Sequence, residues 1–344
     1  MTTFINKESY LDDIRQILSW NFPWDRLDGR NILITGATGL ICSVIVDALM
    51  QNPLRRYNVY ICGRNEAGAR KRFPDYWNND DFHFLKQDLN EPITTDICFQ
   101  YIIHGAGFSF PAAFASDPVG TITGTIKGTA GILEYALQKG LERMVFISTG
   151  EIYGEGDTDI WQEHDSGYVD ILNPRACYPT AKRAAENLCA AYVSQHNLSV
   201  SIARLSHIYG ATFTDSDNRA YAQFIRCALN GSDIILKSDG ASRRSYCYVA
   251  DCVSAILHVL FYGNAGMAYN IADNSNLVSV RTLAETIAKE AGVSVRFQIP
   301  DSSESKGYSN VRNISLDPSL AISLGWKPQT SLKDGVKRII SILK

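Results

Sequence analysis

Short apolar runs alternate with amphipathic segments along most of the chain, and this alternation predicts an α/β protein. Runs of aliphatic and β-branched residues suit buried strands. They occupy residues 31–35, 59–62, 82–89, 101–104, 144–149, 201–205 and 269–272. Apolar residues at helical spacing lie between most of these runs. We therefore expect a Rossmann-type doubly wound parallel sheet, followed by a smaller C-terminal α/β lobe.

The first 28 residues form a segment of their own. Leu11, Ile14 and Ile17 recur at helical spacing, and the aromatic stretch Trp-Asn-Phe-Pro-Trp follows at residues 20–24. This pattern predicts a helix and an aromatic arm that dock on the main domain. A contact between two copies of the chain is the alternative.

A glycine-rich turn joins the strand expected at residues 31–35 to the helix after it. The turn reads Gly-Ala-Thr-Gly-Leu-Ile-Cys and begins at Gly36. Glycines let the backbone approach a pyrophosphate, whose charge is stabilised by the helix N-terminus. The usual third glycine is Cys42 here, and its small side chain can fit with some displacement. The predicted dinucleotide contacts in this turn are Gly36, Thr38, Gly39, Leu40 and Ile41.

The second and third expected strands bear on the choice between NAD and NADP. An NAD site commonly places an acidic residue at the end of the second strand to bind the ribose. This chain has Arg64 there, which could instead meet a 2′-phosphate, so a modest preference for NADP stands beside the alternative of NAD. The third strand is expected to end at Asp88, where Asp88 and Leu89 could contact the adenine.

Two further strands end in turns of small or polar residues. His-Gly-Ala-Gly begins at His104 and is expected to pass under the cofactor, with His104 and Ala106 among the contacts. No metal-ligand partner lies at useful spacing from His104, so a structural role is the alternative. The strand at 144–149 leads into Thr149 and Glu151. Ligands of open parallel sheets lie at these strand ends, so both are candidate site residues.

Tyr178 and Lys182 stand four residues apart in a helical stretch that reads Tyr-Pro-Thr-Ala-Lys. Residues at this spacing share one face of a helix. A nearby cation favours a phenolate and lowers the phenol pKa from about 10 toward the working range. Such a phenolate can take the proton of an alcohol whose carbon gives up a hydride to the dinucleotide.

The composition argues against several classes of protein. The chain has 344 residues and a net charge of −3, which argues against binding driven by nucleic-acid phosphates. No apolar run reaches the roughly 18 residues of a membrane span, and the start of the chain does not resemble a signal peptide. Eight scattered cysteines without a Cys-x-x-Cys pair are typical of reduced thiols. We expect a cytoplasmic protein with no metal site, no nucleic-acid partner and no membrane association.

The motifs together resemble an extended short-chain dehydrogenase/reductase of the nucleotide-sugar-modifying NAD-dependent epimerase/dehydratase family. The resemblance covers almost everything from Asn31 onward and rests on GATGLIC, HGAG, STGEIYG, YPTAK and RLSHIYG in family order. The stretches NPRACY, DNR and RRSYCYVAD are most similar to UDP-glucuronate decarboxylases. Dehydratases of the dTDP-glucose type and epimerases share the same frame. The resemblance implies a tightly bound NAD or NADP and a nucleotide-diphosphate sugar as substrate.

The resemblance also implies roles for single residues. Thr149 would hydrogen-bond the sugar 4-hydroxyl, Tyr178 would be the base, and Lys182 would be its electrostatic partner and ribose anchor. Glu151 would lie near C5 or C6 of the sugar. Tyr178 and Lys182 are thus counted as both catalytic and cofactor-binding residues. The expected substrate contacts are Ser109, His207, Arg219 and Arg244.

Three positions depart from the family pattern. Gly150 stands where dTDP-glucose dehydratases have an acidic proton donor and decarboxylases have a serine. His207 and Thr125 each replace an asparagine. The exact reaction therefore stays open between dehydration, decarboxylation and epimerisation, each after oxidation at C4. An NADPH-dependent 4-keto-deoxysugar reductase and a non-catalytic dinucleotide sensor are the alternatives.

The expected domains follow from these motifs. Residues 1–28 form the arm, 29–205 the dinucleotide-binding domain and 206–344 mainly the substrate lobe, with about 244–272 returning to the first domain. The family precedent of helices that pair across a two-fold axis suggests a homodimer.

Overall fold

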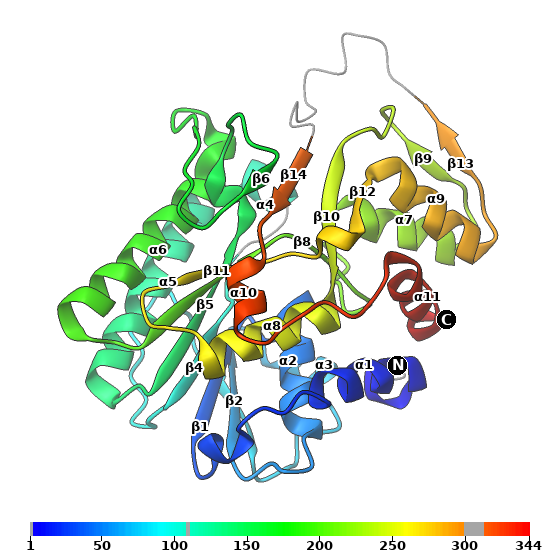
Figure 1. Ribbon diagram of the computed structural model, residues 1–344. Helices are drawn as coiled ribbons and strands as arrows, with labels where there is room; N and C mark the ends of the chain where they lie inside the picture. The colour runs from blue at the N-terminus through cyan, green and yellow to red at the C-terminus, as the bar shows by residue number, and fades with distance from the viewer. Residues whose placement is uncertain (1–2, 108–110, 299–312) are drawn as a thin grey trace.

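The computed structural model describes residues 3–107, 111–298 and 313–344. Within them, the largest sheet has seven strands, all parallel (Figure 1). Their spatial order is β11 (Ala268–Ile271), β7 (Val200–Leu205), β5 (Arg143–Thr149), β4 (Tyr101–His104), β1 (Asn31–Thr35), β2 (Asn58–Gly63) and β3 (Phe82–Lys86). The chain starts this sheet at β1, the third strand from one edge, extends to that edge through β2 and β3, and then adds β4, β5, β7 and β11 on the other side of β1. The predicted doubly wound parallel sheet is confirmed.

Side chains that alternate in direction along the strands form an apolar core on each face of the sheet. Leu33 of β1 packs in one apolar cluster, whereas its neighbours Ile32 and Ile34 pack in the other. In β4, Ile102 and Ile103 divide in the same way. Successive strand side chains point to opposite faces, so a strand covered on both sides must be apolar at every position. This is why the strands read as unbroken apolar runs in the sequence.

Helices cover both faces of the sheet. On one face α5 (Pro118–Lys139) and α6 (Cys177–His196) pack side by side, and on the other α2 (Leu40–Gln51) packs against α8 (Val249–Tyr262) (Figure 1). Within α8, every residue but the last is buried, because the helix lies between the sheet and the outer helices. The remaining helices are α1 (Glu8–Leu18), α3 (Glu66–Arg72), α4 (Pro111–Ser116), α7 (Ala220–Leu229), α9 (Val280–Ala291), α10 (Ser319–Ser323) and α11 (Leu332–Leu343).

Segments from β6 onward build smaller sheets above the carboxyl ends of the large sheet. One has the order β12 (Leu277–Ser279), β10 (Arg243–Tyr248), β14 (Asn313–Leu316) and β6 (Ile160–Trp161), with β8 (His207–Tyr209) also paired to β10. The other pairs β13 (Val295–Phe297) with β9 (Ile234–Leu236). Short 3-10 helices complete the structure: η1 (Phe4–Asn6), η2 (Trp24–Leu27), η3 (Gly150–Tyr153), η4 (Pro174–Ala176) and η5 (Asn274–Asn276).

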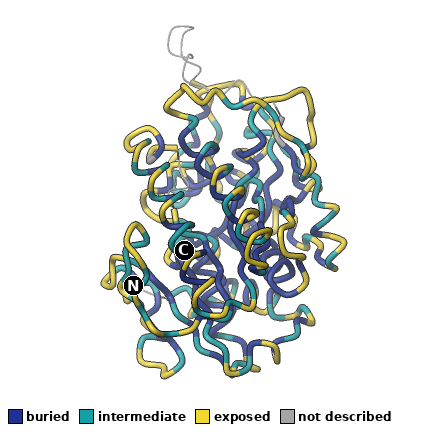
Figure 2. Tube along the Cα trace, turned by 90° about the vertical axis from the view of Figure 1, so that its left-hand side faces the viewer, coloured by how far each residue is buried: buried dark blue, intermediate teal, exposed yellow. Residues whose placement is uncertain are grey.

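The N-terminal segment packs against α8 and the C-terminal helix. Phe22 stacks on Phe261 at 5.4 Å between ring centroids and meets the His258 ring edge-on at 4.7 Å. Asp13 of α1 accepts hydrogen bonds from Tyr248 and Arg338 at 2.6 and 2.7 Å. Figure 2 shows the buried segments running through the middle of the molecule, with exposed segments around them. The expected docking of this segment on the main body is thus observed.

One predicted strand end was wrong. The third strand was expected to continue to Asp88, but β3 ends at Lys86. Asp88 lies in the loop that follows, where its carboxylate accepts the backbone N–H of Asn90 at 3.0 Å. Local bonds of an aspartate to the backbone two residues on favour a turn over a continued strand.

Candidate active site

A pocket of about 860 Å³ opens at the carboxyl ends of the large sheet, between the sheet and the smaller lobe. One end is formed by the glycine-rich turn before α2, and the other by residues from β5, α6, β8, β10 and β14. Loops at the carboxyl ends of parallel strands meet at one edge, which is the general position for ligands in open α/β sheets. Of the predicted site residues, the pocket lining includes Gly36, Thr38, Gly39, Leu40, Ile41, Ala106, Thr149, Glu151, Tyr178, Lys182, His207, Arg219 and Arg244.

The glycine-rich turn packs directly against the turn that follows β4. Gly36 has φ of +69°, and a Cβ placed on it would lie 2.6 Å from the carbonyl oxygen of Gly105. A Cβ on Gly105 would in turn lie 2.5 Å from the Cys42 sulfur. Gly39 caps α2 with no side-chain hydrogen bond, so the first N–H groups of the helix face the pocket end without a side-chain acceptor there. This geometry suits a pyrophosphate.

His104, Arg64, Asp88 and Leu89 lie outside the pocket lining. His104 is buried, with Nδ1 2.7 Å from the Thr35 hydroxyl and Nε2 3.3 Å from that of Thr129. Burial, and then the nearby Lys182 ammonium, lower its pKa to about 3. A neutral imidazole that bonds two threonines links β4, β1 and α5, so its observed contacts are structural. The predicted contact at Ser109 falls outside the described residues.

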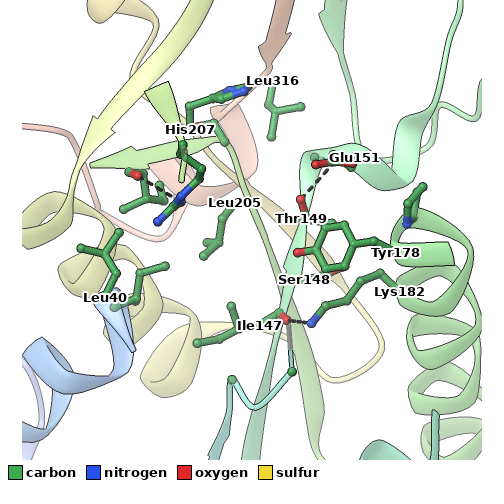
Figure 3. Close-up of a pocket in the computed structure, with 18 of the residues that line it drawn as sticks. Leu40, Ile147, Ser148, Thr149, Glu151, Tyr178, Lys182, Leu205, His207 and Leu316 are labelled. Carbon is green, nitrogen blue, oxygen red and sulfur yellow. Dashed lines mark hydrogen bonds between the residues drawn. The ribbon is translucent and has the colours of Figure 1, made fainter. Parts of the chain in front are cut away.

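Tyr178 and Lys182 both face the pocket from α6, but their polar atoms have different partners (Figure 3). The Lys182 ammonium donates to the carbonyl oxygen of Ile147 at 2.7 Å and lies 4.5 Å above the Phe146 ring. Burial lowers the Lys182 pKa to about 8, although Glu186 opposes this. The lysine is therefore anchored to the end of β5, directly beneath the tyrosine.

The Tyr178 pKa is raised, where the sequence predicted a lowered one. Burial is the main cause, and the Glu151 carboxylate adds to it, while a hydrogen bond with Thr149 and the cations Arg219 and Arg175 oppose it. The ring is 6% exposed and is stacked on Phe114 at 4.3 Å with an interplanar angle of 13°. The prediction considered only Lys182, one helical turn away, which would lower the pKa. It could not include Phe114, which covers the ring and is distant in sequence.

Thr149 and Glu151 meet at the start of η3, where β5 ends. The Thr149 hydroxyl accepts the backbone N–H of Glu151 at 3.2 Å, which is a helix N-cap. The Glu151 carboxylate pairs with the guanidinium of Arg175 at 3.2 Å. Figure 3 shows Thr149 and Glu151 on the same side of the pocket as Tyr178. The three groups thus line one wall.

The opposite wall carries four polar residues, Asp217, Arg219, His207 and Arg244. Burial raises the pKa of the Asp217 carboxyl, but Arg219 at 2.6 Å outweighs it, so this pKa is lowered overall. His207 has a pKa lowered to about 3 by burial and by the Arg244 and Arg219 cations. Its Nδ1 is buried and has no hydrogen-bond partner among the described residues. The Arg244 guanidinium donates to the carbonyl oxygen of Arg243 at 2.9 Å. This wall is cationic and offers donors to an anionic ligand.

Sequence reasoning missed three residues that surround Thr149, Glu151 and Tyr178. Arg175 stands three positions before Tyr178, a spacing that could have placed it beside the tyrosine. Phe114 and Leu316 carried no such signal, because they come from α4 and β14 and reach the site only through the fold. A Cβ on Gly150 would lie 3.1 Å from Leu316 Cδ1, so this leucine occupies the space beside the absent side chain.

The fold and the pocket together define a dinucleotide-binding enzyme of the short-chain dehydrogenase/reductase class. The sequence profile of the NAD dependent epimerase/dehydratase family matches residues 32–272, and the chain belongs to that family. It is 30% identical over 305 residues to UDP-glucuronic acid decarboxylase 3 of Arabidopsis thaliana, which covers 89% of this chain and 86% of that protein. It is 27% identical over 317 residues to UDP-glucuronic acid decarboxylase 1 of Xenopus tropicalis, covering 91% of this chain and 72% of that protein.

Solved structures agree with this assignment. A crystal structure of UDP-glucose 4-epimerase from Thermotoga maritima with UDP-glucose has a TM-score of 0.79 at 25% identity, covering 91% of this chain and 98% of that one. The fold is also that of dTDP-glucose 4,6-dehydratase from Streptomyces venezuelae, with a TM-score of 0.77 at 24% identity and coverage of 91% and 96%. The fold class and the family predicted from sequence are confirmed. No helix in the described ranges combines the length and apolar character of a membrane span.

Proposed function

We propose that the protein oxidises C4 of a nucleotide-bound hexuronate, releases its C6 carboxylate as carbon dioxide and then reduces the C4 ketone again. The observation that carries the proposal is the wall formed by Thr149, Glu151 and Tyr178, which continues into the turn at Gly36. NAD, when bound, supplies the acceptor and later the donor of the C4 hydride. Thr149 and Tyr178 hold the 4-hydroxyl, and Tyr178 takes its proton. A 4-ketone stabilises the electron pair that the C5–C6 bond leaves behind.

Two observations favour decarboxylation over loss of water. The relatives named above at 30% and 27% identity are UDP-glucuronic acid decarboxylases. Elimination of water from C5 and C6 needs a proton donor beside Glu151, and at Gly150 this place is filled by the Leu316 side chain.

We infer that the cofactor is NAD rather than NADP. The family is described as NAD dependent, and the Arg64 guanidinium is paired with the Asp88 carboxylate at 3.8 Å. That carboxylate would repel a 2′-phosphate. The turn from Gly36 to Cys42 is proposed to hold the pyrophosphate, and Lys182 the nicotinamide ribose. Release of the bound dinucleotide and its identification by mass tests this: recovery of NADP as the main species would contradict it.

The reaction is tested with a panel of UDP-, dTDP-, CDP- and GDP-linked hexuronates and hexoses. We expect one of the hexuronates to give a product lighter by carbon dioxide, with no net reduction of the cofactor. A product lighter by water, or an isomer of unchanged mass, would instead assign dehydration or epimerisation. The second candidate, a 4-keto-sugar reductase, is favoured by Arg64 at the ribose position and would consume NADPH in proportion to product.

A homodimer is the proposed assembly. Helices α5 and α6 pack side by side and form one outer face of the molecule (Figure 1). Val119 and Leu137 on α5 expose large apolar side chains, at 71% and 41% of their area. Sedimentation of the protein at micromolar concentration tests the proposal, and a monomer under these conditions would contradict it.

A further inference from the structure

An ion pair connects two charged side chains of the pocket. Arg175 Nη2 lies 3.2 Å from Glu151 Oε2, and both side chains line the pocket. The backbone of Arg175 is held in η4, because the Asn173 side chain accepts the Arg175 backbone N–H at 3.0 Å. The direction of the arginine is therefore set by a cap just before the catalytic helix.

An aromatic stack holds the guanidinium from the other side. The centre of the Arg175 guanidinium lies 4.9 Å from the centroid of the Phe114 ring, and that ring stacks on Tyr178 at 4.3 Å. A cation over an aromatic face is attracted by the ring quadrupole. Arg175, Phe114 and Tyr178 thus form a three-layer stack, and the outer layer is the one that contacts Glu151.

The pair between Arg175 and Glu151 adds little to the stability of the fold. The two side chains are 46% and 42% exposed, and an ion pair this exposed contributes little to the free energy of folding. The pair does matter to a ligand inside the pocket. A C6 carboxylate placed beside an unpaired Glu151 would be repelled, because like charges a few ångströms apart disfavour each other.

We propose that Arg175 is a positioning residue that offsets the charge of Glu151 and so allows the site to accept a sugar carboxylate at C6. This inference rests on the function proposed above and specifies its substrate class as hexuronates rather than neutral hexoses. In the step concerned, the C5–C6 bond breaks and carbon dioxide leaves. The electron pair of that bond passes into the enolate of the C4 ketone, and C5 then takes up a proton. Arg175 acts chiefly on this step, because its effect on the Tyr178 pKa is smaller than the effects of burial, Glu151, Thr149 and Arg219.

The test separates the two halves of the reaction in wild type, Arg175→Gln and Arg175→Lys. Single turnovers with the hexuronate that wild type decarboxylates are followed by absorbance of reduced nicotinamide and by release of carbon dioxide. With Arg175→Gln, we expect the hexuronate concentration needed for saturation to rise. At saturating hexuronate, C4 oxidation should stay within about threefold of wild type and carbon dioxide release should fall tenfold or more. Reduced nicotinamide should then accumulate. Arg175→Lys, which retains the charge, should recover part of the lost rate.

The matched neutral hexose supplies an internal control, because it carries no charge at C6. Its oxidation by Arg175→Gln should stay within about threefold of that by wild type. Arg243→Gln is the control variant: Arg243 is exposed, donates to the carbonyl oxygen of Leu277 and lies outside the pocket lining. It should leave both half-reactions unchanged.

Two results would overturn the inference. In one, Arg175→Gln releases carbon dioxide at the wild-type rate. In the other, oxidation and decarboxylation fall by the same factor for hexuronate and hexose alike, which would indicate a general structural role. If wild type decarboxylates no hexuronate of the panel, the proposed function itself fails and this inference fails with it.

Discussion

Tyr178 illustrates how packing changes the chemistry of a residue at the scale of single side chains. Phe114 covers its ring, and burial raises the phenol pKa although Arg175 and Arg219 oppose this. A buried phenol holds its proton in the resting site and gives it up only when a strong local acceptor or cation offsets the cost of desolvation. The proposed base therefore acts only as the phenolate, after such an acceptor or cation in the filled site has removed or displaced the phenol proton.

Tyr178→Phe should abolish most hydride transfer. General base catalysis contributes about 10² to 10⁴ in rate, and we expect single-turnover formation of reduced nicotinamide to fall by a factor in this range. Tyr192→Phe, on the same helix and only partly buried, serves as the control and should react like wild type. A rate within threefold of wild type for Tyr178→Phe would contradict the assignment of the base.

Lys182 should make stability depend on pH. Its folded pKa of about 8 is below the ordinary lysine pKa of 10.5. The unfolded chain therefore binds more protons between these values, and the free energy of unfolding rises with pH there. Below pH 8 the buried ammonium is fully destabilising. At about 1.4 kcal/mol per pH unit, the difference between wild type and Lys182→Met should shift by roughly 3 kcal/mol in favour of wild type from pH 8 to 10.5.

Urea unfolding of both proteins, freed of cofactor, at pH 7.5, 9 and 10.5 measures this difference. Groups common to both proteins cancel in the comparison. A difference that stays constant across the three pH values would show that Lys182 titrates alike in the folded and unfolded states.

At the scale of elements, the site depends on how two turns meet between β1, α2 and β4. Gly36 adopts a left-handed φ and lies against Gly105, while Cys42 fills the space on the other side of Gly105. The third glycine of the common pattern can be replaced here because the turn after β4 has no side chain at the point of contact. Gly150 is similar, because the Leu316 side chain of β14 fills the space beside a glycine that has no side chain of its own.

Gly36→Ala should weaken both folding and cofactor binding. Its φ of +69° costs an alanine about 1 kcal/mol or more, and the added Cβ would lie 2.6 Å from a backbone oxygen that cannot easily move. Gly29→Ala is a matched control, because Gly29 has the same φ and nothing within 4 Å of its Cβ position. Titration with NAD and urea unfolding should show a larger loss for Gly36→Ala. Equal losses would mean that strain alone, and not contact between the turns, matters.

Gly150→Ser and Leu316→Ala should be coupled. A side chain at 150 presses on the end of Leu316, and removal of that leucine alone leaves a cavity that costs about 2–5 kcal/mol. The double variant should therefore lose less stability than the sum of the two single variants, by about 0.5–2 kcal/mol. Urea unfolding of the four proteins gives the coupling energy. Additive losses would show that the two positions do not share space.

At the scale of the whole molecule, distant parts of the chain meet around α8. The aromatic arm packs on its outer side, and Asp251 accepts the backbone N–H groups of Gln329 and Thr330 at 3.0 and 2.9 Å. The sheet covers the opposite side of this helix. Residues from the first and last tenths of the chain are thus part of the same core as the dinucleotide-binding sheet.

Phe22→Ala should destabilise the entire protein and not only its N-terminal arm. Phe22 is 5% exposed and contacts Trp24, His258 and Phe261, so its truncation should cost about 3 kcal/mol. Tyr262→Phe removes only an exposed hydrogen bond to Asn21 and should cost less than about 0.5 kcal/mol. Unfolding by urea with two probes tests this, and a separate early transition for the arm would contradict a shared core.

The order of strands and helices could be predicted from sequence because it depends on local patterns. The strand at Asn31–Thr35 and the helix from Glu8 to Leu18 match the expected runs closely, since apolar periodicity is a property of neighbouring residues. The end of β3 was missed because the turn at Asp88 depends on one side-chain hydrogen bond. The domain boundaries stay predictions.

By itself the sequence determined the fold class, the family and the residue types at the carboxyl ends of the strands, because motifs such as the turn at Gly36 combine spacing with chemistry. Only the tertiary structure decided what surrounds these residues. Phe114 over Tyr178, Arg175 on Glu151 and Leu316 beside Gly150 join segments that lie apart along the chain. Burial and charge at a site are sums over all neighbours in space, and neighbours along the sequence are only a few of them.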